Sequence, residues 1–311
     1  MQPVAIIDLG TNTFHLLITE LNGSYEVKFR ARRSVRLGHE GMEEKQIHPN
    51  AQERALSALS YFKGVIKENN IHEVHAYGTS AFRNANNGRV FAQKIKENTG
   101  IEVNIIDGER EAELICNGVR LATEIEDHTL IVDIGGGSVE FIIANEKDVL
   151  WKRSYEIGAQ RLLQMFHKED PIHPDDVDCM ETYLSNELEE LFIQLRKYQV
   201  RQMVGASGTF DTLFDIQHSR NNKKTNKKST TEVLDKNTYW ETHRKLLTLD
   251  KEGRLAMKGM IPMRADMIVV ASCLISFILK RHLIELIKTS RYALKEGVLY
   301  EIINENASVS I

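Results

Sequence analysis

The sequence of 311 residues contains only three cysteines, no long apolar run and no excess of positive charge. Cys116, Cys179 and Cys273 lie far apart and lack the spacing of metal ligands, so we expect buried thiols in a reducing cytoplasm. The longest apolar run, residues 267–279, is too short to span a bilayer and predicts a buried helix. A net charge of −4 argues against a general nucleic-acid-binding protein. The first strand pattern begins near the N-terminus, and we expect neither a signal peptide nor an association with membranes.

Basic residues nevertheless cluster at two places in the sequence. The lysine cluster lies within residues 219–231, a polar stretch without apolar periodicity, which favours a solvated, flexible loop. The arginine cluster leaves two interpretations open, because exposed arginines are common and guanidinium groups also suit bidentate contacts with phosphate. The clusters consist of Lys223, Lys224, Lys227 and Lys228, and of Arg30, Arg32, Arg33 and Arg36.

The most informative feature of the sequence is one short stretch that occurs twice. Residues 6–18 align without a gap on residues 131–143. Each copy is an apolar run that ends in an aspartate, Asp8 or Asp133, followed by a turn of small residues and a second run rich in apolar and β-branched residues. The pattern predicts two β-hairpins, each with a carboxylate at its mouth.

The two predicted turns suit phosphate. Gly10 in the first turn, and Gly135, Gly136 and Gly137 in the second, lack a Cβ, so the backbone can adopt positive φ and direct its N–H groups at an anion. The neighbouring carboxylate would repel a phosphate unless a divalent cation stood between them. A single Asp-x-Gly turn can simply join two strands, but the duplication favours two facing hairpins that hold a polyphosphate and its metal.

Two further strands run into loops of small residues that each open a helix. The first loop, residues 78–80, is expected to begin a helix that continues to about residue 98, and residues 205–209 repeat the pattern in the second half. Such a helix start leaves N–H groups at its tip that suit an anion. Arg83 lies one turn into the first of these helices and could contact the same anion.

Residues 107–113 place four acidic side chains at the start of another predicted helix. Carboxylates at a helix N-terminus are mildly stabilising, and this accounts for Glu109 and Glu113. Glu111 is our candidate for chemistry, because hydrolysis of a phosphoanhydride needs a carboxylate to orient and deprotonate a water molecule.

The length of the chain and its 42% hydrophobic residues suit two domains of ordinary size. Apolar residues at helical spacing after Pro174 predict one long helix that belongs to a core and does not form a cofactor site. A closing helix, at about residues 293–311, is expected to pack back on the first domain. The apolar positions of the long helix are Val177, Met180, Leu184, Leu188, Leu191 and Leu195.

Seven short motifs occur in one order along the chain, and together they resemble the exopolyphosphatase and guanosine pentaphosphate phosphohydrolase family. The resemblance covers nearly the whole sequence. The motifs are Asp-x-Gly-x-Asn at Asp8, Gly-Thr-Ser-Ala-Phe-Arg at residues 78–83, Ile-x-Gly-x-x-Glu-Ala at 106–112, Asp-Ile-Gly-Gly-Gly-Ser at 133–138, Gly-Ala-Ser-Gly-Thr at 205–209, Arg-Ala-Asp at 264–266 and Ala-Leu-Lys-Glu-Gly at 293–297.

The resemblance implies an α/β fold of the actin, Hsp70 and sugar-kinase superfamily, with two ribonuclease-H-like domains around a cleft. We expect these domains at residues 1–122 and 123–292. Long members of the family carry additional C-terminal helical domains, so the resemblance favours a short, two-domain member without a dedicated channel for long polyphosphate.

The resemblance also implies roles for particular residues. Glu111 would be the general base, Arg83 would contact the terminal phosphoryl group, and Glu140 would help to position metal and water. The expected metal ligands are Asp8, Asp133 and Glu140. The expected phosphate-binding residues are Gly10, Thr11, Asn12, Thr13, Gly135, Gly136, Gly137, Ser138, Ser207, Gly208 and Thr209.

Our hypothesis from the sequence is a cytoplasmic hydrolase that releases terminal phosphate from inorganic polyphosphate, guanosine pentaphosphate or both. Mg²⁺ or another divalent cation is the expected cofactor, a monovalent cation is a further candidate, and a homodimer is compatible with the composition. Two alternatives stay open: a kinase or ATPase of the same fold, and a non-catalytic sensor that binds polyphosphate or a nucleotide.

Overall fold

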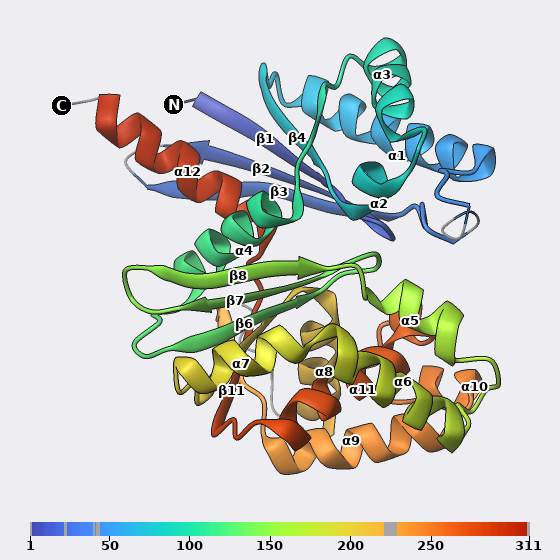
Figure 1. The fold of residues 1–311 in the computed structure, drawn as a ribbon. Helices are drawn as coiled ribbons and strands as arrows, with labels where there is room; N and C mark the ends of the chain where they lie inside the picture. Colours follow the sequence, from blue (N-terminus) through green and yellow to red (C-terminus); the bar gives the residue numbers. More distant parts are fainter. Residues whose placement is uncertain (1, 22–23, 40, 42–43, 221–228, 310–311) are drawn as a thin grey trace. The chain divides into compact units, whose positions relative to one another are not determined.

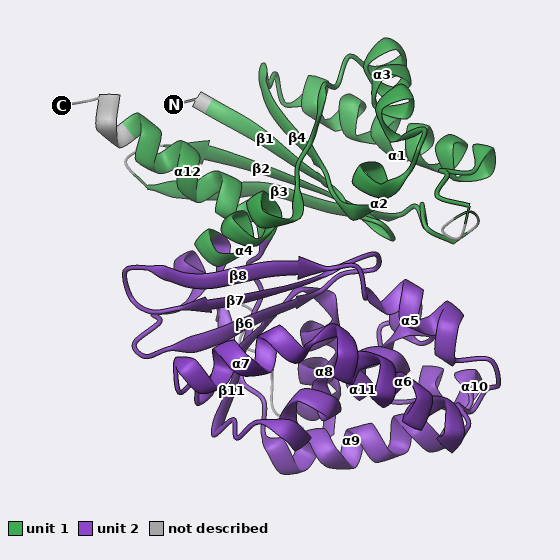
Figure 2. Cartoon of the chain, viewed as in Figure 1, with its two compact units in different colours: residues 1–117, 294–311 green, residues 118–293 purple. Residues whose placement is uncertain are grey.

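The computed structural model describes residues 2–21, 24–39, 41, 44–220 and 229–309. The chain divides into two compact units, shown in Figure 2: residues 1–117 with 294–311 form unit 1, and residues 118–293 form unit 2. Each unit contains a mixed β-sheet and helices, which confirms the α/β class. The division between the units falls inside helix α4 (Gly108–Ala122), whereas the sequence placed a domain boundary at the end of this helix.

The sheet of unit 1 has the strand order β3-β2-β1-β4-β5. The first three strands form an antiparallel meander, and β4 and β5 are parallel to β1. The predicted first hairpin is therefore present, with Asp8 paired with His15 across its two strands. The strands are β1 (Gln2–Leu9), β2 (Thr13–Leu21), β3 (Tyr25–Ser34), β4 (Glu73–Gly78) and β5 (Val103–Ile105).

Helices cover both faces of this sheet (Figure 1). Alternate residues of β1, namely Ala5, Ile7 and Leu9, belong to a buried apolar cluster with α1 and α3, while α12 contacts β1 from the face that carries Asp8. This alternation follows from the two-residue period of a strand. The helices of unit 1 are α1 (Pro49–Glu68), α2 (Ser80–Asn84), α3 (Gly88–Thr99), α12 (Leu294–Val309) and the first part of α4.

The structure corrects the expectation of a single helix from residue 80 to about 98. The chain forms α2 and then α3, because Asn87 bonds to another part of the unit. Its Oδ1 accepts from the Ile47 N–H at 2.9 Å, and its Nδ2 donates to the Ile47 carbonyl at 3.0 Å. At the start of α3, a Cβ on Gly88 would lie 2.0 Å from the Phe82 carbonyl oxygen, so the close return of the chain requires glycine.

The sheet of unit 2 has the strand order β10-β11-β9-β6-β7-β8. Read from β8, it repeats the order of unit 1, with β10 added beyond β11. The predicted second hairpin is present, and Asp133 is paired with Glu140 across it. The strands are β6 (Thr129–Ile134), β7 (Val139–Ala144), β8 (Val149–Tyr155), β9 (Gln202–Ala206), β10 (Thr231–Val233) and β11 (Leu286–Ser290).

The helices of unit 2 pack around α11, which is buried from Met267 to Ile278. Because α11 is apolar on all sides, burial along its whole length is the stable arrangement, as the sequence predicted. The helices are α5 (Ala159–Phe166), α6 (Pro174–Glu187), α7 (Glu189–Lys197), α8 (Ser207–Arg220), α9 (Lys236–Thr248), α10 (Lys251–Leu255) and α11 (Met267–Arg281), with a 3-10 turn, η1 (Pro262–Arg264).

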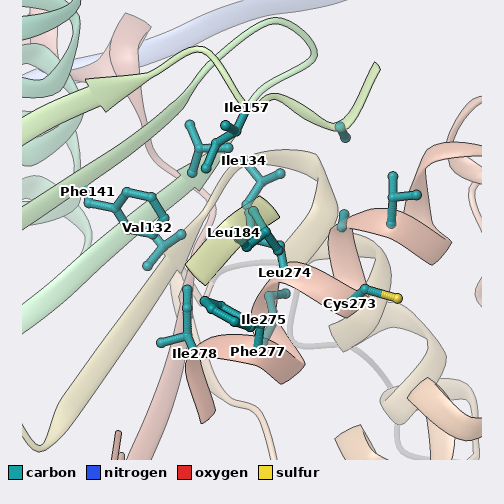
Figure 3. Packing of buried hydrophobic residues seen from close by; sticks show 14 of the residues in the cluster. Val132, Ile134, Phe141, Ile157, Leu184, Cys273, Leu274, Ile275, Phe277 and Ile278 are labelled. Atoms are coloured by element: carbon teal, nitrogen blue, oxygen red, sulfur yellow. The ribbon is translucent and has the colours of Figure 1, made fainter. Parts of the chain in front are cut away.

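Figure 3 shows side chains from the sheet and from α11 in one apolar cluster. Val132 and Phe141 come from β6 and β7, and Ile275 and Phe277 come from α11. Phe277 also meets Phe192 edge to face, with ring centroids 5.7 Å apart. Among the described residues, no helix has both the length and the apolar content that crossing a membrane requires.

Three further expectations have different outcomes. Cys179 is exposed on α6, so the expectation that every thiol is buried is wrong, although Cys116 and Cys273 are buried. The expected single helix after Pro174 is divided at Leu188 into α6 and α7, while the apolar stripe itself lies in the core. The lysine cluster lies outside the described residues.

A buried histidine in unit 2 makes the stability of the fold depend on pH. His243 on α9 is 6% exposed, and its Nδ1 lies 3.0 Å from the Ser272 hydroxyl of α11. Burial lowers the pKa of His243 from its ordinary 6.5 to about 4, and nearby Lys280 contributes in the same direction. Below pH 6.5 the unfolded chain therefore takes up a proton that the folded chain excludes, so stability falls as the pH falls toward 4.

We expect His243→Gln to weaken this pH dependence. Between pH 7 and pH 5 the wild type should lose about 2 kcal/mol of unfolding free energy through this residue, and the variant should not. Urea unfolding of both proteins at the two pH values measures the difference. Parallel pH profiles for the two proteins would contradict the assignment.

Candidate functional site

The hairpin turn of unit 1 is held by the loop that follows β3. The Asn12 carbonyl accepts hydrogen bonds from the N–H groups of Val35 at 2.9 Å and Arg36 at 3.0 Å, and the Thr11 carbonyl accepts from Gly38 at 3.4 Å. In a planar trans peptide the C=O and the next N–H point in opposite directions. The N–H groups of the two residues that follow Thr11 and Asn12 therefore point away from this loop.

The hairpin turn of unit 2 is held in the same way by the segment after β8, at the start of α5. The carbonyl oxygens of residues 135–137 accept hydrogen bonds from the N–H groups of residues 158–160 at 2.9 to 3.1 Å. A Cβ on Gly158 would lie 2.4 Å from the Gly136 oxygen, so this approach requires glycine. The N–H groups of Gly136 and Gly137 form no hydrogen bond within the described part of the chain, and they remain available for an anion.

Two carboxylates lie side by side next to the second turn. Asp133 and Glu140 are directly opposite each other on β6 and β7, and they are 6% and 1% exposed. The Ser207 hydroxyl donates to Asp133 Oδ2 at 2.7 Å, and the Ser154 hydroxyl donates to Glu140 Oε1 at 2.7 Å. Opposite residues of an antiparallel pair have Cβ atoms about 5 Å apart, so two carboxyl groups are held close together in a buried place.

This pair has the chemistry of a site for Mg²⁺. The ion prefers oxygen ligands and is commonly bound by one or two carboxylates together with the phosphates of a substrate. Among the described residues, no group of three or more His, Cys, Asp or Glu side chains is gathered for a metal. Asp133 and Glu140 alone are two possible ligands, and a cation held by them would have to take its other ligands from water or substrate.

The start of α8 carries a positive charge that the sequence did not assign. Ser207 has a φ of 66°, in the region that non-glycine residues rarely adopt. This strained backbone conformation lies where the chain turns from β9 into α8. A Cβ on Gly208 would lie 2.2 Å from Arg264 Nη2, so the guanidinium of Arg264 rests directly on the first turn of α8. The Arg-Ala-Asp motif indicated that Arg264 matters, but only the fold brings it to Gly208.

Arg264 lies in the turn η1, and the backbone next to it is held by Arg254. Arg254 is 1% exposed and donates through Nε to the Ala265 carbonyl at 2.6 Å. Its Nη1 donates to Asp170 Oδ1 at 2.6 Å and to the Leu249 carbonyl at 2.7 Å. A buried guanidinium with these three acceptors fixes the backbone next to Arg264.

In unit 1, Arg83 and Glu111 form an ion pair. Arg83 Nη1 lies 2.9 Å from Glu111 Oε2 and also donates to the Ile106 carbonyl at 3.1 Å. Glu111 is 7% exposed. The helix that carries it is capped by Asp107, whose Oδ1 accepts from the Arg110 N–H at 2.7 Å.

This pairing was not part of the sequence interpretation, which assigned Arg83 to a phosphoryl group. A guanidinium has five N–H donors and can bind a carboxylate and a phosphate together. The structure thus gathers the predicted residues in two groups: Arg83 with Glu111 of α4 in unit 1, and Asp133 with Glu140 and the start of α8 in unit 2. Asp8 is the last residue but one of β1, close to the first turn.

These features define an α/β protein with a duplicated sheet, in which each half has its own carboxylate and its own restrained turn. The chain belongs to the Ppx/GppA phosphatase family, whose model matches residues 18–306. The family resemblance found in the seven motifs is thereby confirmed.

Two curated relatives show how far the similarity extends. A guanosine-5'-triphosphate,3'-diphosphate pyrophosphatase of Photobacterium profundum is 28% identical over 302 residues, which are 97% of this chain and 59% of the relative. A putative exopolyphosphatase of Haemophilus influenzae is 28% identical over 304 residues, which are 97% of this chain and 92% of the relative. The chain thus spans only 59% of the length of the first of these proteins.

Solved structures have the same fold. The crystal structure of an exopolyphosphatase from Cytophaga hutchinsonii is 43% identical, with a TM-score of 0.93 and coverage of 98% of both chains. The Aquifex aeolicus family member is 25% identical, with a TM-score of 0.80 over 98% of this chain and 99% of that one.

The contact between Gly208 and Arg264 gives a test of residues 207–209, the sequence-predicted phosphate loop that forms the first turn of α8. Gly208→Ala should displace the flexible guanidinium while the fold persists, because the atoms in the way are the far end of a side chain. If this loop binds phosphate, the affinity for tripolyphosphate should fall about tenfold, as expected for the loss of a charge-assisted hydrogen bond.

Isothermal titration measures this affinity, and Gly64→Ala serves as the control, because a Cβ there meets nothing within 4 Å. Equal affinities for Gly208→Ala and the control would show that Arg264 makes no contribution at this loop.

Proposed function

We propose that this chain is a phosphohydrolase that removes terminal phosphate from inorganic polyphosphate, guanosine pentaphosphate or both. The observation that carries the proposal is the ion pair of Glu111 and Arg83, which holds a nearly buried carboxylate at the start of α4. Membership of a phosphatase family and the activities for which the relatives are named support the same class of substrate.

Glu111 is the proposed general base. Its carboxylate accepts a hydrogen bond from a water molecule and takes the proton of that water as the oxygen attacks the terminal phosphorus. The bond between this phosphorus and the bridging oxygen breaks, and the shortened phosphate chain leaves with the bridging oxygen. Arg83 keeps the carboxylate in one orientation, and its remaining N–H groups offset charge on the transferred phosphoryl group.

The phosphates that are not transferred are proposed to bind at the restrained turns and at the start of α8. The N–H groups of Gly136 and Gly137 point away from the loop that holds their carbonyls, and phosphate oxygens can occupy that side. Arg264 adds a full positive charge beside Gly208.

A divalent cation is proposed at the carboxylates. Asp133 and Glu140 would hold it in unit 2, and Asp8 is the corresponding candidate ligand in unit 1. Bound Mg²⁺ would neutralise phosphate charge next to these carboxylates. We place the reaction in the cytoplasm, in line with the scarcity of cysteine.

Glu111→Gln is expected to abolish phosphate release and leave binding of polyphosphate largely intact. Glutamine keeps the shape of the side chain and an acceptor for Arg83, but it cannot take a proton from water. Phosphate release with Mg²⁺ from long polyphosphate, guanosine pentaphosphate and ATP, measured in parallel, tests the activity and ranks the substrates.

Glu109→Gln is the matched control, since Glu109 is an exposed carboxylate in the first turn of the same helix. Wild-type turnover by Glu111→Gln would remove Glu111 as the base. Binding of polyphosphate by the wild-type protein without any release would favour a sensor, and transfer from ATP to an acceptor would favour a kinase.

Removal of metal gives a separate test of the acidic pair. Phosphate release should stop in excess EDTA and return when Mg²⁺ is added. Asp133→Asn removes one charge from the pair and should raise the Mg²⁺ concentration for half-maximal activity at least about tenfold, as is typical for changes at metal sites. Full activity in EDTA, or an unchanged Mg²⁺ requirement in Asp133→Asn, would refute the assignment.

A further inference from the structure

We propose that the C-terminal helix α12 positions Glu111 and is therefore part of the catalytic apparatus, acting through α4. This inference rests on the proposed function, because it concerns the reactivity of the proposed base. Both helices belong to unit 1 over the residues concerned, and Figure 1 shows α12 beside the first turns of α4.

The two helices meet through their backbones one turn after Glu111. A Cβ on Gly297 would lie 1.7 Å from the carbonyl oxygen of Leu114, so α12 can approach α4 this closely only with glycine at that position. A contact between backbones leaves no flexible side chain to absorb a shift. Any displacement of α12 at Gly297 is passed directly to the turn of α4 that carries Glu111.

A single carboxylate of α12 then holds α4 at two points. Glu301 forms a bidentate ion pair with Arg110, in which Arg110 Nη1 lies 2.8 Å from Oε1 and Nη2 contacts Oε2. The Asn117 amide donates to the same Oε1 at 3.3 Å. The hydrogen bonds between Arg110 and Glu301 are the main reason that the pKa of Arg110 is raised above its usual value. Because Arg110 and Asn117 lie two turns apart, on either side of Glu111, both the rotation and the axial position of α4 are set.

The helix α12 is in turn fixed to the sheet. Glu296 is fully buried, and its Oε1 accepts from Arg30 Nη1 of β3 at 2.7 Å, while Lys295 Nζ lies 3.3 Å from its other oxygen. This assigns one member of the arginine cluster to a structural ion pair. The chain of contacts runs from β3 through Glu296 to α12, and from α12 through Gly297 and Glu301 to α4.

This geometry predicts an effect on the chemical step. The turns and Arg264, which we propose to bind phosphates, do not lie on α4, so a shift of α4 should leave substrate binding largely unchanged. A general base that moves by about 1 Å can lose on the order of a hundredfold in rate. Loosening the Arg110–Glu301 pair should therefore lower kcat and leave KM nearly constant.

The test compares Arg110→Ala, Arg110→Lys and Gly297→Ala in the chain of 311 residues, with tripolyphosphate as substrate and Mg²⁺ present. We expect kcat to fall at least about tenfold in Arg110→Ala with KM within about twofold of the wild type. Arg110→Lys, which keeps the charge, should recover kcat to within about threefold. Gly297→Ala should lower kcat as well, because the added methyl group separates the two backbones.

Glu102→Gln is the control, since it removes an exposed ion pair with Lys96 in the same unit and should leave kcat unchanged. All rates are measured at a temperature where thermal unfolding shows each variant to be folded. A lower unfolding temperature with wild-type kcat in Arg110→Ala would overturn the positioning role while the wild-type activity upholds the proposed function. No release of phosphate by the wild type would overturn both.

Discussion

In both units a neighbouring loop holds the carbonyl oxygens of the hairpin turn, and the proposed chemistry depends on this restraint. A planar peptide cannot direct its oxygen toward one side without directing the next N–H toward the other. Residues 35–38 in unit 1 and residues 158–160 in unit 2 follow the third strand of their sheets, so the same topological position supplies the restraint twice. The duplicated stretch of sequence therefore repeats a structural arrangement that orients the backbone N–H groups of each turn.

The sequence predicts the features that depend on local pattern. The apolar strands and the turn of small residues that form a hairpin lie within 13 residues of one another, and both hairpins form as expected. The buried helix α11 also follows from its composition alone. The break between α2 and α3 does not follow from local sequence. The hydrogen bonds that cause it join Asn87 to Ile47, and no pattern within residues 80–98 predicts this partner.

The candidate site follows the same division. Glu111 and Asp133 could be selected from the sequence, because Glu111 lies in an acidic helix start and Asp133 comes before a glycine-rich turn. The contact of Arg264 with Gly208 could not be predicted, since it is created by the packing of η1 against the start of α8 and maintained by buried Arg254. Arg254 is buried and Asp170 is about one third exposed, so loss of Asp170 would leave a buried guanidinium without its counter-charge, and the pair helps to hold the turn in place.

The two copies of the hairpin differ in the residue that lies opposite the aspartate. In unit 2 the residue opposite the strand-end aspartate is Glu140, and two adjacent carboxylates suit a divalent cation. In unit 1 the matching residue is His15, so Asp8 faces a side chain that is neutral or positive rather than a second carboxylate. Unit 1 instead provides Glu111, whose carboxylate is paired with the positive charge of Arg83 rather than with a second carboxylate. A base must keep an orientation toward water and a free lone pair, whereas a metal ligand must give its lone pairs to the ion. In the proposed function the base lies on α4 and the acidic pair lies on the second hairpin, so each carboxylate can be tuned for one role.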